Sequence, residues 1–216
     1  VTFVDSDDIL ESVEIKNALT CIKYIECDVF YTRLDSFDDK SFQLLQGPKA
    51  RSFKYNLILQ EYSLTRETNI LRRFVVPHGK IMRADYLRNA ALLFEPTKYS
   101  NDVLFSSNLL SFEPRVMVLD LCFYKVRQGG ISLTSNRDSD STKIRLAVLA
   151  RYNNSLIEGN CSHLCIPAIS FLIRLPFAEF IKYTIDLLRH RQPIFFAKFS
   201  FYLFVRSFIF KLFSGN

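Results

Sequence analysis

The chain has 216 residues, of which 49% are hydrophobic and 23% are charged, and its formal net charge is +6. This length and composition fit one large folded domain, alone or with an appendage, and they exclude a disordered chain. The five cysteines are odd in number and lack a framework spacing, which excludes a small disulfide scaffold and leads us to expect a reducing cytoplasm.

The first third of the chain predicts a strand, an acidic turn and a helix. Residues 1–4 favour a strand, residues 5–8 are mostly acidic, and apolar residues then recur at helical spacing over 9–20. A second strand is expected at 28–32, followed by an acidic loop through Asp39. From there to Arg73 the pattern gives no clear element.

The middle of the chain predicts helices around one clear strand. Residues 77–89 have loose helical spacing, and Ser100 is placed to cap a helix that ends before Pro114. Residues 116–124 alternate and are rich in β-branched and aromatic types, which predicts a strand.

A polar stretch separates that strand from the last third of the chain. Gly129 and Gly130 end the strand signal, and residues 135–142 are polar, which predicts an exposed and mobile segment. A helix is expected over 143–157, and Pro176 suits the first position of another helix. The apolar face of that second helix carries Phe177, Phe180, Ile181, Ile185 and Leu188.

Residues 171–216 are unusually aromatic and basic. They hold 11 of the 21 Phe, and seven Lys or Arg against two acids, so +5 of the net charge lies there. No charge-free run in this segment approaches the roughly 18–20 apolar residues that cross a bilayer. We therefore expect the segment to lie at the inner leaflet of the plasma membrane, with Lys198, Arg206 and Lys211 at anionic head groups. The alternative is that it packs on the rest of the chain or on a second subunit.

Two acids in the first turn are candidate metal ligands. Asp5 and Asp7 are two residues apart at a strand end, so an extended backbone would aim both carboxylates to one side. Such a pair suits Mg²⁺ or Mn²⁺, which take one or two carboxylates and fill their other positions with water and substrate phosphate. The alternative is a helix start, because Asp8 and Glu11 resemble a capping box. A zinc site at Cys161, His163 and Cys165 is not expected, because no fourth ligand has zinc-site spacing.

The acidic turn opens a succession of motifs that resembles family 2 glycosyltransferases. Phe3-Val4-Asp5-Ser6-Asp7-Asp8 resembles the family's hydrophobic strand followed by Asp-x-Asp-Asp. His78-Gly79-Lys80-Ile81-Met82-Arg83-Ala84-Asp85-Tyr86-Leu87 resembles its Lys-hydrophobic-x-Arg-x-x-x-Leu segment. Leu93-Phe94-Glu95-Pro96 resembles the apolar stretch before its acceptor-side acid. Ser100-Asn101-Asp102-Val103-Leu104-Phe105 resembles Glu-Asp-hydrophobic-x-Phe, with Asn101 in place of Glu. Tyr124-Lys125-Val126-Arg127 followed by Ser132-Leu133-Thr134 resembles Tyr-x-x-Arg with Ser-Ile-Thr.

The resemblance implies a fold and a set of roles. It implies an α/β chain, the C-terminal part of a glycosyltransferase A-type (Rossmann-like) domain, followed by a helical, Phe-rich basic tail. Asp102 would be the general base for the acceptor hydroxyl, and Asp5 and Asp7 would bind Mn²⁺ or Mg²⁺. Asp5, Lys80, Arg83 and Arg127 would bind substrate, Arg127 as a clamp on the diphosphate. The alternatives are a helix-stabilising role for Asp102 and solvated surface charges for Lys80, Arg83 and Arg127.

The motifs also define what we expect of the chain as a whole. Residues 1–140 form a partial catalytic domain, and residues 141–216 form a helical extension. The family's nucleotide-binding half precedes the Asp motif and is missing here, so the sheet edge is expected to be open. The predicted function is transfer of a sugar from a nucleotide-sugar donor to a saccharide or lipid-linked acceptor, in the cytoplasm at the inner face of the membrane. The alternative is a non-catalytic remnant that serves as a membrane-associated interaction module, and no nucleic-acid partner is expected.

Overall fold

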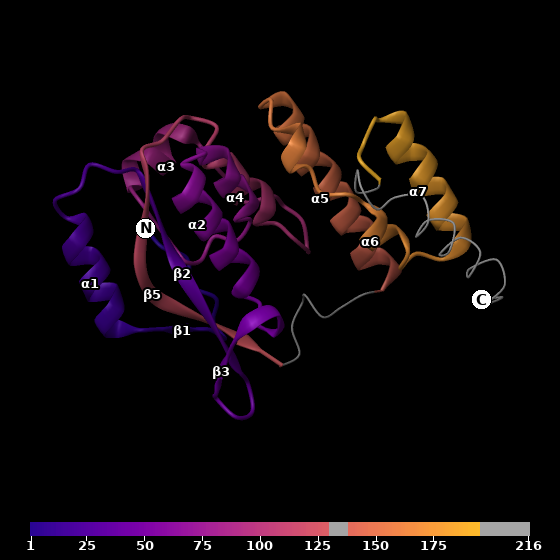
Figure 1. Ribbon diagram of the computed structural model, residues 1–216. Helices are drawn as coiled ribbons and strands as arrows, with labels where there is room; N and C mark the ends of the chain where they lie inside the picture. The colour runs from indigo at the N-terminus through magenta and orange to yellow at the C-terminus, as the bar shows by residue number, and fades with distance from the viewer. Residues whose placement is uncertain (130–137, 195–216) are drawn as a thin grey trace. The chain divides into compact units, whose positions relative to one another are not determined.

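The computed structural model describes residues 1–129 and 138–194. These residues belong to two compact units, Val1–Glu95 with Asp102–Ile131, and Pro96–Asn101 with Ser132–Asn216 (Figure 1). The predicted Ser132-Leu133-Thr134 motif and the segment carrying Lys198, Arg206 and Lys211 lie outside the described residues. The assignment of residues 1–140 to a catalytic domain stays a prediction.

The first unit is built on a mixed sheet of five strands, β1 (Ile9–Leu10), β2 (Val29–Asp38), β3 (Leu44–Leu45), β4 (Lys80–Met82) and β5 (Val116–Gln128). The order is β1-β5-β2-β3, with β4 also paired to β2. The two long strands β2 and β5 run parallel, and the other pairs are antiparallel. The register between β2 and β5 shifts after Thr32, so that Leu34 pairs with Tyr124. The predicted α/β class is confirmed.

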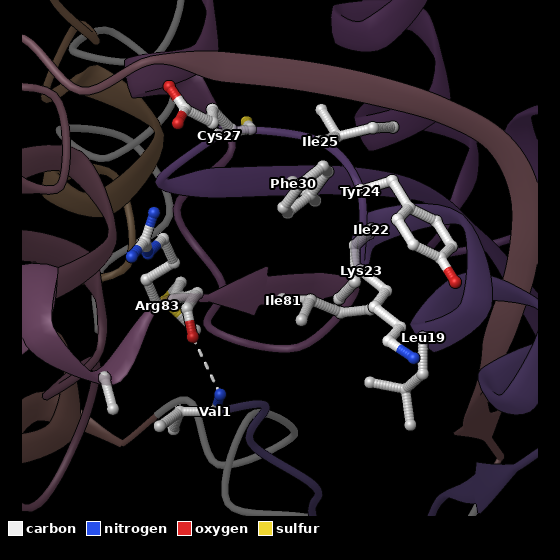
Figure 2. A pocket seen from close by; sticks show the side chains of 13 residues that line it. Val1, Leu19, Ile22, Lys23, Tyr24, Ile25, Cys27, Phe30, Ile81 and Arg83 are labelled. Atoms are coloured by element: carbon white, nitrogen blue, oxygen red, sulfur yellow. Dashed lines mark hydrogen bonds between the residues drawn. The ribbon is translucent and has the colours of Figure 1, made fainter.

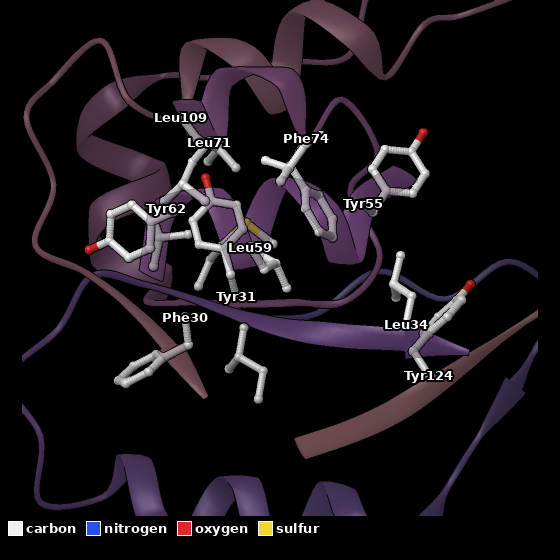
Figure 3. Close-up of a cluster of buried hydrophobic side chains, with 14 of the residues drawn as sticks. Phe30, Tyr31, Leu34, Tyr55, Leu59, Tyr62, Leu71, Phe74, Leu109 and Tyr124 are labelled. Atoms are coloured by element: carbon white, nitrogen blue, oxygen red, sulfur yellow. The ribbon is translucent and has the colours of Figure 1, made fainter. Parts of the chain in front are cut away.

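Helices cover both faces of this sheet. They are α1 (Ser12–Ile22), α2 (Phe53–Thr65), α3 (Ala84–Ala90) and α4 (Val103–Asn108), with 3₁₀ turns at Gly47–Lys49 and Thr68–Arg73. Figure 1 shows α1 on the opposite side of the sheet from α2 and α4. Successive residues of β2 therefore enter different layers, with Phe30 pointing to the α1 side and Tyr31 to the α2 side (Figure 3).

The larger layer of the core is formed by β2, α2 and the Thr68–Arg73 turn. Tyr55, Ile58, Leu59 and Tyr62 are buried at the i, i+3, i+4, i+7 spacing of one helix face. They belong to one buried cluster with Leu71 and Phe74. Figure 3 shows Tyr55, Leu59 and Tyr62 with Leu71 and Phe74 above β2. This layer fixes the segment 74–79 that leads into β4.

Several predicted boundaries in this unit were wrong. Residues 1–5 form no regular strand, although Val1 and Met82 exchange two backbone hydrogen bonds of 2.7 and 2.8 Å. The helix expected over 9–20 begins only at Ser12, because Ile9 and Leu10 pair with β5. The second strand continues to Asp38, where a loop was expected. Its buried Ser36 is tolerated because its Oγ and that of Ser52 share a 3.0 Å hydrogen bond.

The region around the predicted 77–89 helix also differs. It divides into β4 and the shorter α3, and the strand is possible because its buried lysine is satisfied internally. Ser100 does not cap a helix, since its φ is 57° and α4 begins after Asp102. The strand expected over 116–124 is confirmed as part of β5.

The second unit is helical. It contains α5 (Ser139–Glu158), a 3₁₀ turn at Ser162–Leu164, α6 (Ile169–Leu172) and α7 (Phe177–Arg189). The helices predicted over 143–157 and after Pro176 are confirmed. Residues 139–142 were expected to be mobile, but they belong to α5 because the Asp138 carboxylate accepts a 2.6 Å hydrogen bond from the Ser141 amide. Within the described ranges, no helix is both long and apolar enough to cross a membrane.

Candidate active site

Residues Asp5–Asp8 form a tight turn held against β5. The Asp8 amide donates to the Asp5 carbonyl at 3.2 Å, which closes the turn. The Tyr124 hydroxyl accepts from the Asp5 amide at 2.9 Å and donates to one Asp8 carboxylate oxygen at 2.8 Å. The other Asp8 oxygen accepts from the Arg127 amide at 2.7 Å. The capping-box interpretation was therefore wrong, because the Asp8 carboxylate binds β5 and not the start of α1.

His78 faces this turn from the segment before β4. Its ring stacks on Tyr124 with a centroid distance of 4.7 Å and an interplanar angle of 7°. The preceding layer of the core leaves His78 only 8% exposed. Its Nδ1 is buried, lies 3.9 Å from Asp5 Oδ2, and has no hydrogen-bond partner among the described residues.

The imidazole of His78 is neutral at physiological pH. Burial, with smaller effects from Lys80 and Lys54, lowers the pKa of His78 to about 3. A neutral imidazole has a lone pair on its unprotonated nitrogen. The Nδ1 atom of His78 is buried and has no hydrogen-bond partner among the described residues. That is the state in which histidine ligates metals.

Gly79 makes this placement of His78 possible. Its φ is +69°, and a Cβ at this position would lie 2.4 Å from Leu34 Cδ2. Any side chain here would strain the backbone and push into the buried core. The His-Gly pair therefore brings the backbone against β2 while turning the imidazole toward the acidic turn.

Three side chains offer metal donors at one point. One ligand atom each from Asp5, Asp8 and His78 lie within 4.8 Å of one another. Trans ligands on a hexacoordinate Mg²⁺ are separated by about 4.2 Å, so a small side-chain adjustment brings the set into coordination range. The donor set, two carboxylates and an imidazole with an orphaned nitrogen, fits a divalent cation.

Burial and, to a smaller extent, the repulsion between neighbouring acids raise the pKa of two carboxyl groups in the turn. Burial, followed by Asp8, Asp7 and Asp102, raises the pKa of Asp5. Burial also raises the pKa of Asp8, although its bonds from the Arg127 amide and the Tyr124 hydroxyl act in the opposite direction. A bound cation would relieve this repulsion.

Asp7 lies outside the three-donor set. Residues 5–8 turn instead of continuing as a strand, and the donor group that converges contains Asp5 and Asp8 but not the predicted Asp7. The Asp7 carboxylate lies 3.9 Å from Arg127 Nε, and Asp39 lies 3.3 Å from the same nitrogen. Arg127 is thus beside the acidic turn, as a diphosphate clamp would have to be, but it is held by two carboxylates in this structure.

Asp102 precedes α4 and lies within electrostatic range of Asp5. Its side chain caps no helix amide, and burial raises the pKa of Asp102 despite opposing effects from its own backbone, Lys80 and Lys54. A raised pKa brings a carboxylate nearer the range that a general base needs.

Lys80 is placed differently from the prediction. It is fully buried, and its ammonium donates to the Phe74 carbonyl at 2.7 Å and also to the Val76 carbonyl. The Phe74 ring lies 4.7 Å from the same nitrogen. Lys80 therefore fastens the segment before His78, and a substrate in solvent does not reach it in this structure.

Arg83 lies at another place in the unit. It lines a cavity of about 500 Å³ between the end of α1, β4 and Val1, shown in Figure 2. None of the residues around this cavity belongs to the acidic turn or to its three-donor set. The structure thus places Asp102 within electrostatic range of Asp5 and puts Arg127 beside the acidic turn. Lys80 is also within electrostatic range of Asp102 and His78, but it is fully buried, and Arg83 lies at the separate cavity.

Comparisons with known proteins give a distant likeness. No protein-family model matches the chain, and no curated protein matches it. Two crystal structures of S. aureus TarS, residues 1–349, resemble it. The complex with UDP-GlcNAc is 18% identical over 86% of this chain and 48% of that chain, with a TM-score of 0.46. The complex with UDP is 17% identical over 88% and 48%, with a TM-score of 0.47. The chain spans about half the length of these structures.

Proposed function

We propose that the chain carries the metal site and the general base of an inverting glycosyltransferase, which moves a sugar from a nucleotide-sugar donor to a saccharide or lipid-linked acceptor. One observation carries the proposal. The donors of Asp5, Asp8 and His78 converge within 4.8 Å, and Asp102 lies within electrostatic range of Asp5. The order of motifs in the sequence supports the same activity independently.

The three donors suit Mn²⁺ or Mg²⁺, and the imidazole favours Mn²⁺, the softer of the two. When bound, such a cation would stabilise the charge that develops on the departing diphosphate. Asp5, Asp8 and His78 would hold it, with Tyr124 orienting both the turn and the imidazole.

The reaction assigns one task to Asp102. As the acceptor oxygen attacks the anomeric carbon, the Asp102 carboxylate takes the hydroxyl proton. The bond from the anomeric carbon to the diphosphate oxygen breaks, the electron pair leaves with the nucleoside diphosphate, and the configuration inverts. Arg127, already beside the turn, would exchange a carboxylate partner for a diphosphate oxygen.

Binding of Mn²⁺ tests the metal site without requiring turnover. We expect His78→Ala and Asp8→Asn each to weaken Mn²⁺ binding by at least about tenfold in an electron paramagnetic resonance titration. Asp85→Asn is the matched control, because Asp85 is an exposed acid paired with Arg88 in α3. Equal Mn²⁺ affinity for His78→Ala and the unmodified chain would refute the site.

Turnover tests the base. Asp102→Asn is expected to lower kcat by roughly 10²–10⁴, the usual contribution of a positioned general base, with donor affinity little changed. The assay is transfer from a panel of nucleotide-sugars in Mn²⁺, with the nucleotide-binding half restored upstream of the chain. A change confined to donor affinity would assign Asp102 to binding instead.

A non-catalytic remnant is the second candidate, and Asn101 in place of the family's Glu favours it. The metal titration separates the two. A folded chain that does not bind Mn²⁺ would support the remnant.

A further inference from the structure

Helix α7 carries an apolar stripe that the described residues of the second unit leave exposed. Phe180 and Leu187 of this helix are buried. Ile181, Ile185 and Leu188 are spaced by four and three residues, so they share another face, and they remain 37%, 44% and 60% exposed. If all the apolar residues of α7 packed against the rest of the second unit, this second apolar face would not be exposed.

The rim of this stripe is cationic. Lys182 and Arg189 are seven residues apart, and both are exposed beside the stripe. Of the acids in α7, Glu179 is bound by Lys143 at 2.6 Å and by the Ser139 hydroxyl at 2.5 Å. The other acid of α7, Asp186, is exposed four residues from Lys182 and three from Arg189, and it lies 3.8 Å from His190 Nε2. The rim therefore carries the two positive charges of Lys182 and Arg189 against the one negative charge of Asp186.

The sequence that follows has the same chemistry. Residues 195–216 contain eight Phe together with Lys198, Arg206 and Lys211, and no Asp or Glu. An apolar stripe with a cationic rim, followed by a basic and aromatic segment, is complementary to a surface that is apolar inside and anionic outside. A bilayer with anionic head groups is such a surface.

We propose that α7 lies in the interface of an anionic phospholipid membrane, with Ile181, Ile185 and Leu188 at the acyl boundary and Lys182 and Arg189 at lipid phosphates. The helix would lie along the membrane plane. This inference stands on α7 alone and does not require sugar transfer.

A tryptophan on the stripe tests the contact directly. The chain has no Trp, so Leu188→Trp in the full chain gives a single tryptophan, on α7, that can be excited selectively over the ten tyrosines. We expect its emission to shift to the blue with vesicles of phosphatidylcholine and phosphatidylglycerol, and to be quenched by lipids brominated near the head groups. With phosphatidylcholine alone the shift should be much weaker. Leu64→Trp is the control, because Leu64 lies on α2 in the first unit and is 79% exposed.

Three results would overturn the proposal. The first is an unshifted Leu188→Trp spectrum with both kinds of vesicle. The second is a blue-shifted spectrum before vesicles are added, which would show that another part of the chain or a second copy covers the stripe. The third is an equal shift for Leu64→Trp.

Co-sedimentation separates α7 from the segment that follows it. Ile185→Glu, and the pair Lys182→Glu with Arg189→Glu, are each expected to weaken binding to anionic vesicles by at least about tenfold, with circular dichroism unchanged. Leu64→Glu should leave binding unchanged. If the α7 variants bind as tightly as the unmodified chain, the membrane contact lies elsewhere and α7 has no part in it.

Discussion

Replacing Tyr124 by Phe removes one hydroxyl and keeps the ring that stacks on His78. The hydroxyl makes two hydrogen bonds, one from the Asp5 amide and one to the Asp8 carboxylate. A bond to a charged group contributes about 1.5–3 kcal/mol and a neutral one about 0.5–1.5 kcal/mol. Because the turn is partly exposed, water replaces part of this, and we expect a loss of about 2 kcal/mol.

That loss corresponds to a fall in Tm of roughly 4–8 °C for a chain of this size. Because the freed turn no longer presents Asp5 and Asp8 together, Mn²⁺ affinity should fall by about tenfold or more. Thermal unfolding followed by circular dichroism measures the first effect, and the paramagnetic titration measures the second.

Tyr31→Phe is the matched control. Tyr31 is also fully buried, but its hydroxyl has no partner among the described residues. Its removal should change stability by less than about 1 kcal/mol and leave Mn²⁺ affinity unchanged. A Tyr124→Phe chain with the Tm and Mn²⁺ affinity of the unmodified protein would refute the role of this hydroxyl.

Two further substitutions separate structural from substrate-binding roles. Gly79→Ala should lower the free energy of unfolding by about 2–4 kcal/mol in urea, from its positive φ and its overlap with Leu34, whereas Gly47→Ala, with a similar φ but open space around it, should cost only about 1–2 kcal/mol. Lys80→Met leaves the Phe74 and Val76 carbonyls without their donor, so stability should fall by about 1–3 kcal/mol while the folded fraction keeps its nucleotide-sugar affinity. If Lys80→Met loses affinity for the nucleotide-sugar while its stability is unchanged, Lys80 belongs to the substrate site after all.

The sequence predicted best the elements in which hydrophobic residues follow one clear strand or helix period. β5 has the alternation of a half-buried strand, and α5 and α7 have clear helical periods. The second half of β2 contains Ser36 and Asp38 and was read as a loop, because its polar groups are satisfied only by partners such as Ser52. Helix α2 had the buried spacing from Tyr55 to Tyr62 and could have been predicted from it.

The candidate site shows the same division. The order of the motifs predicted that Asp5 and Asp102 belong to one site, and in the structure Asp102 lies within electrostatic range of Asp5. The roles of both residues stay predictions. The sequence did not predict a ligand role for His78, because a single histidine without other ligands at metal-site spacing does not indicate a metal site. Its role became visible only in the fold, where its ring stacks on Tyr124 beside the acidic turn. The burial of Lys80 was not predicted, because lysine is usually exposed. Its burial is possible because its side-chain nitrogen donates hydrogen bonds to the carbonyls of Phe74 and Val76.

The central claim is that Asp5, Asp8 and His78 bind one divalent cation. Anomalous scattering from crystals grown with Mn²⁺ tests it most directly. We predict one strong peak in contact with a carboxylate oxygen of Asp5, a carboxylate oxygen of Asp8 and Nδ1 of His78, at roughly 2.0–2.3 Å from each. A peak shared by Asp5 and Asp7 without His78, or no peak at the turn at Mn²⁺ concentrations that saturate other sites, would contradict the claim.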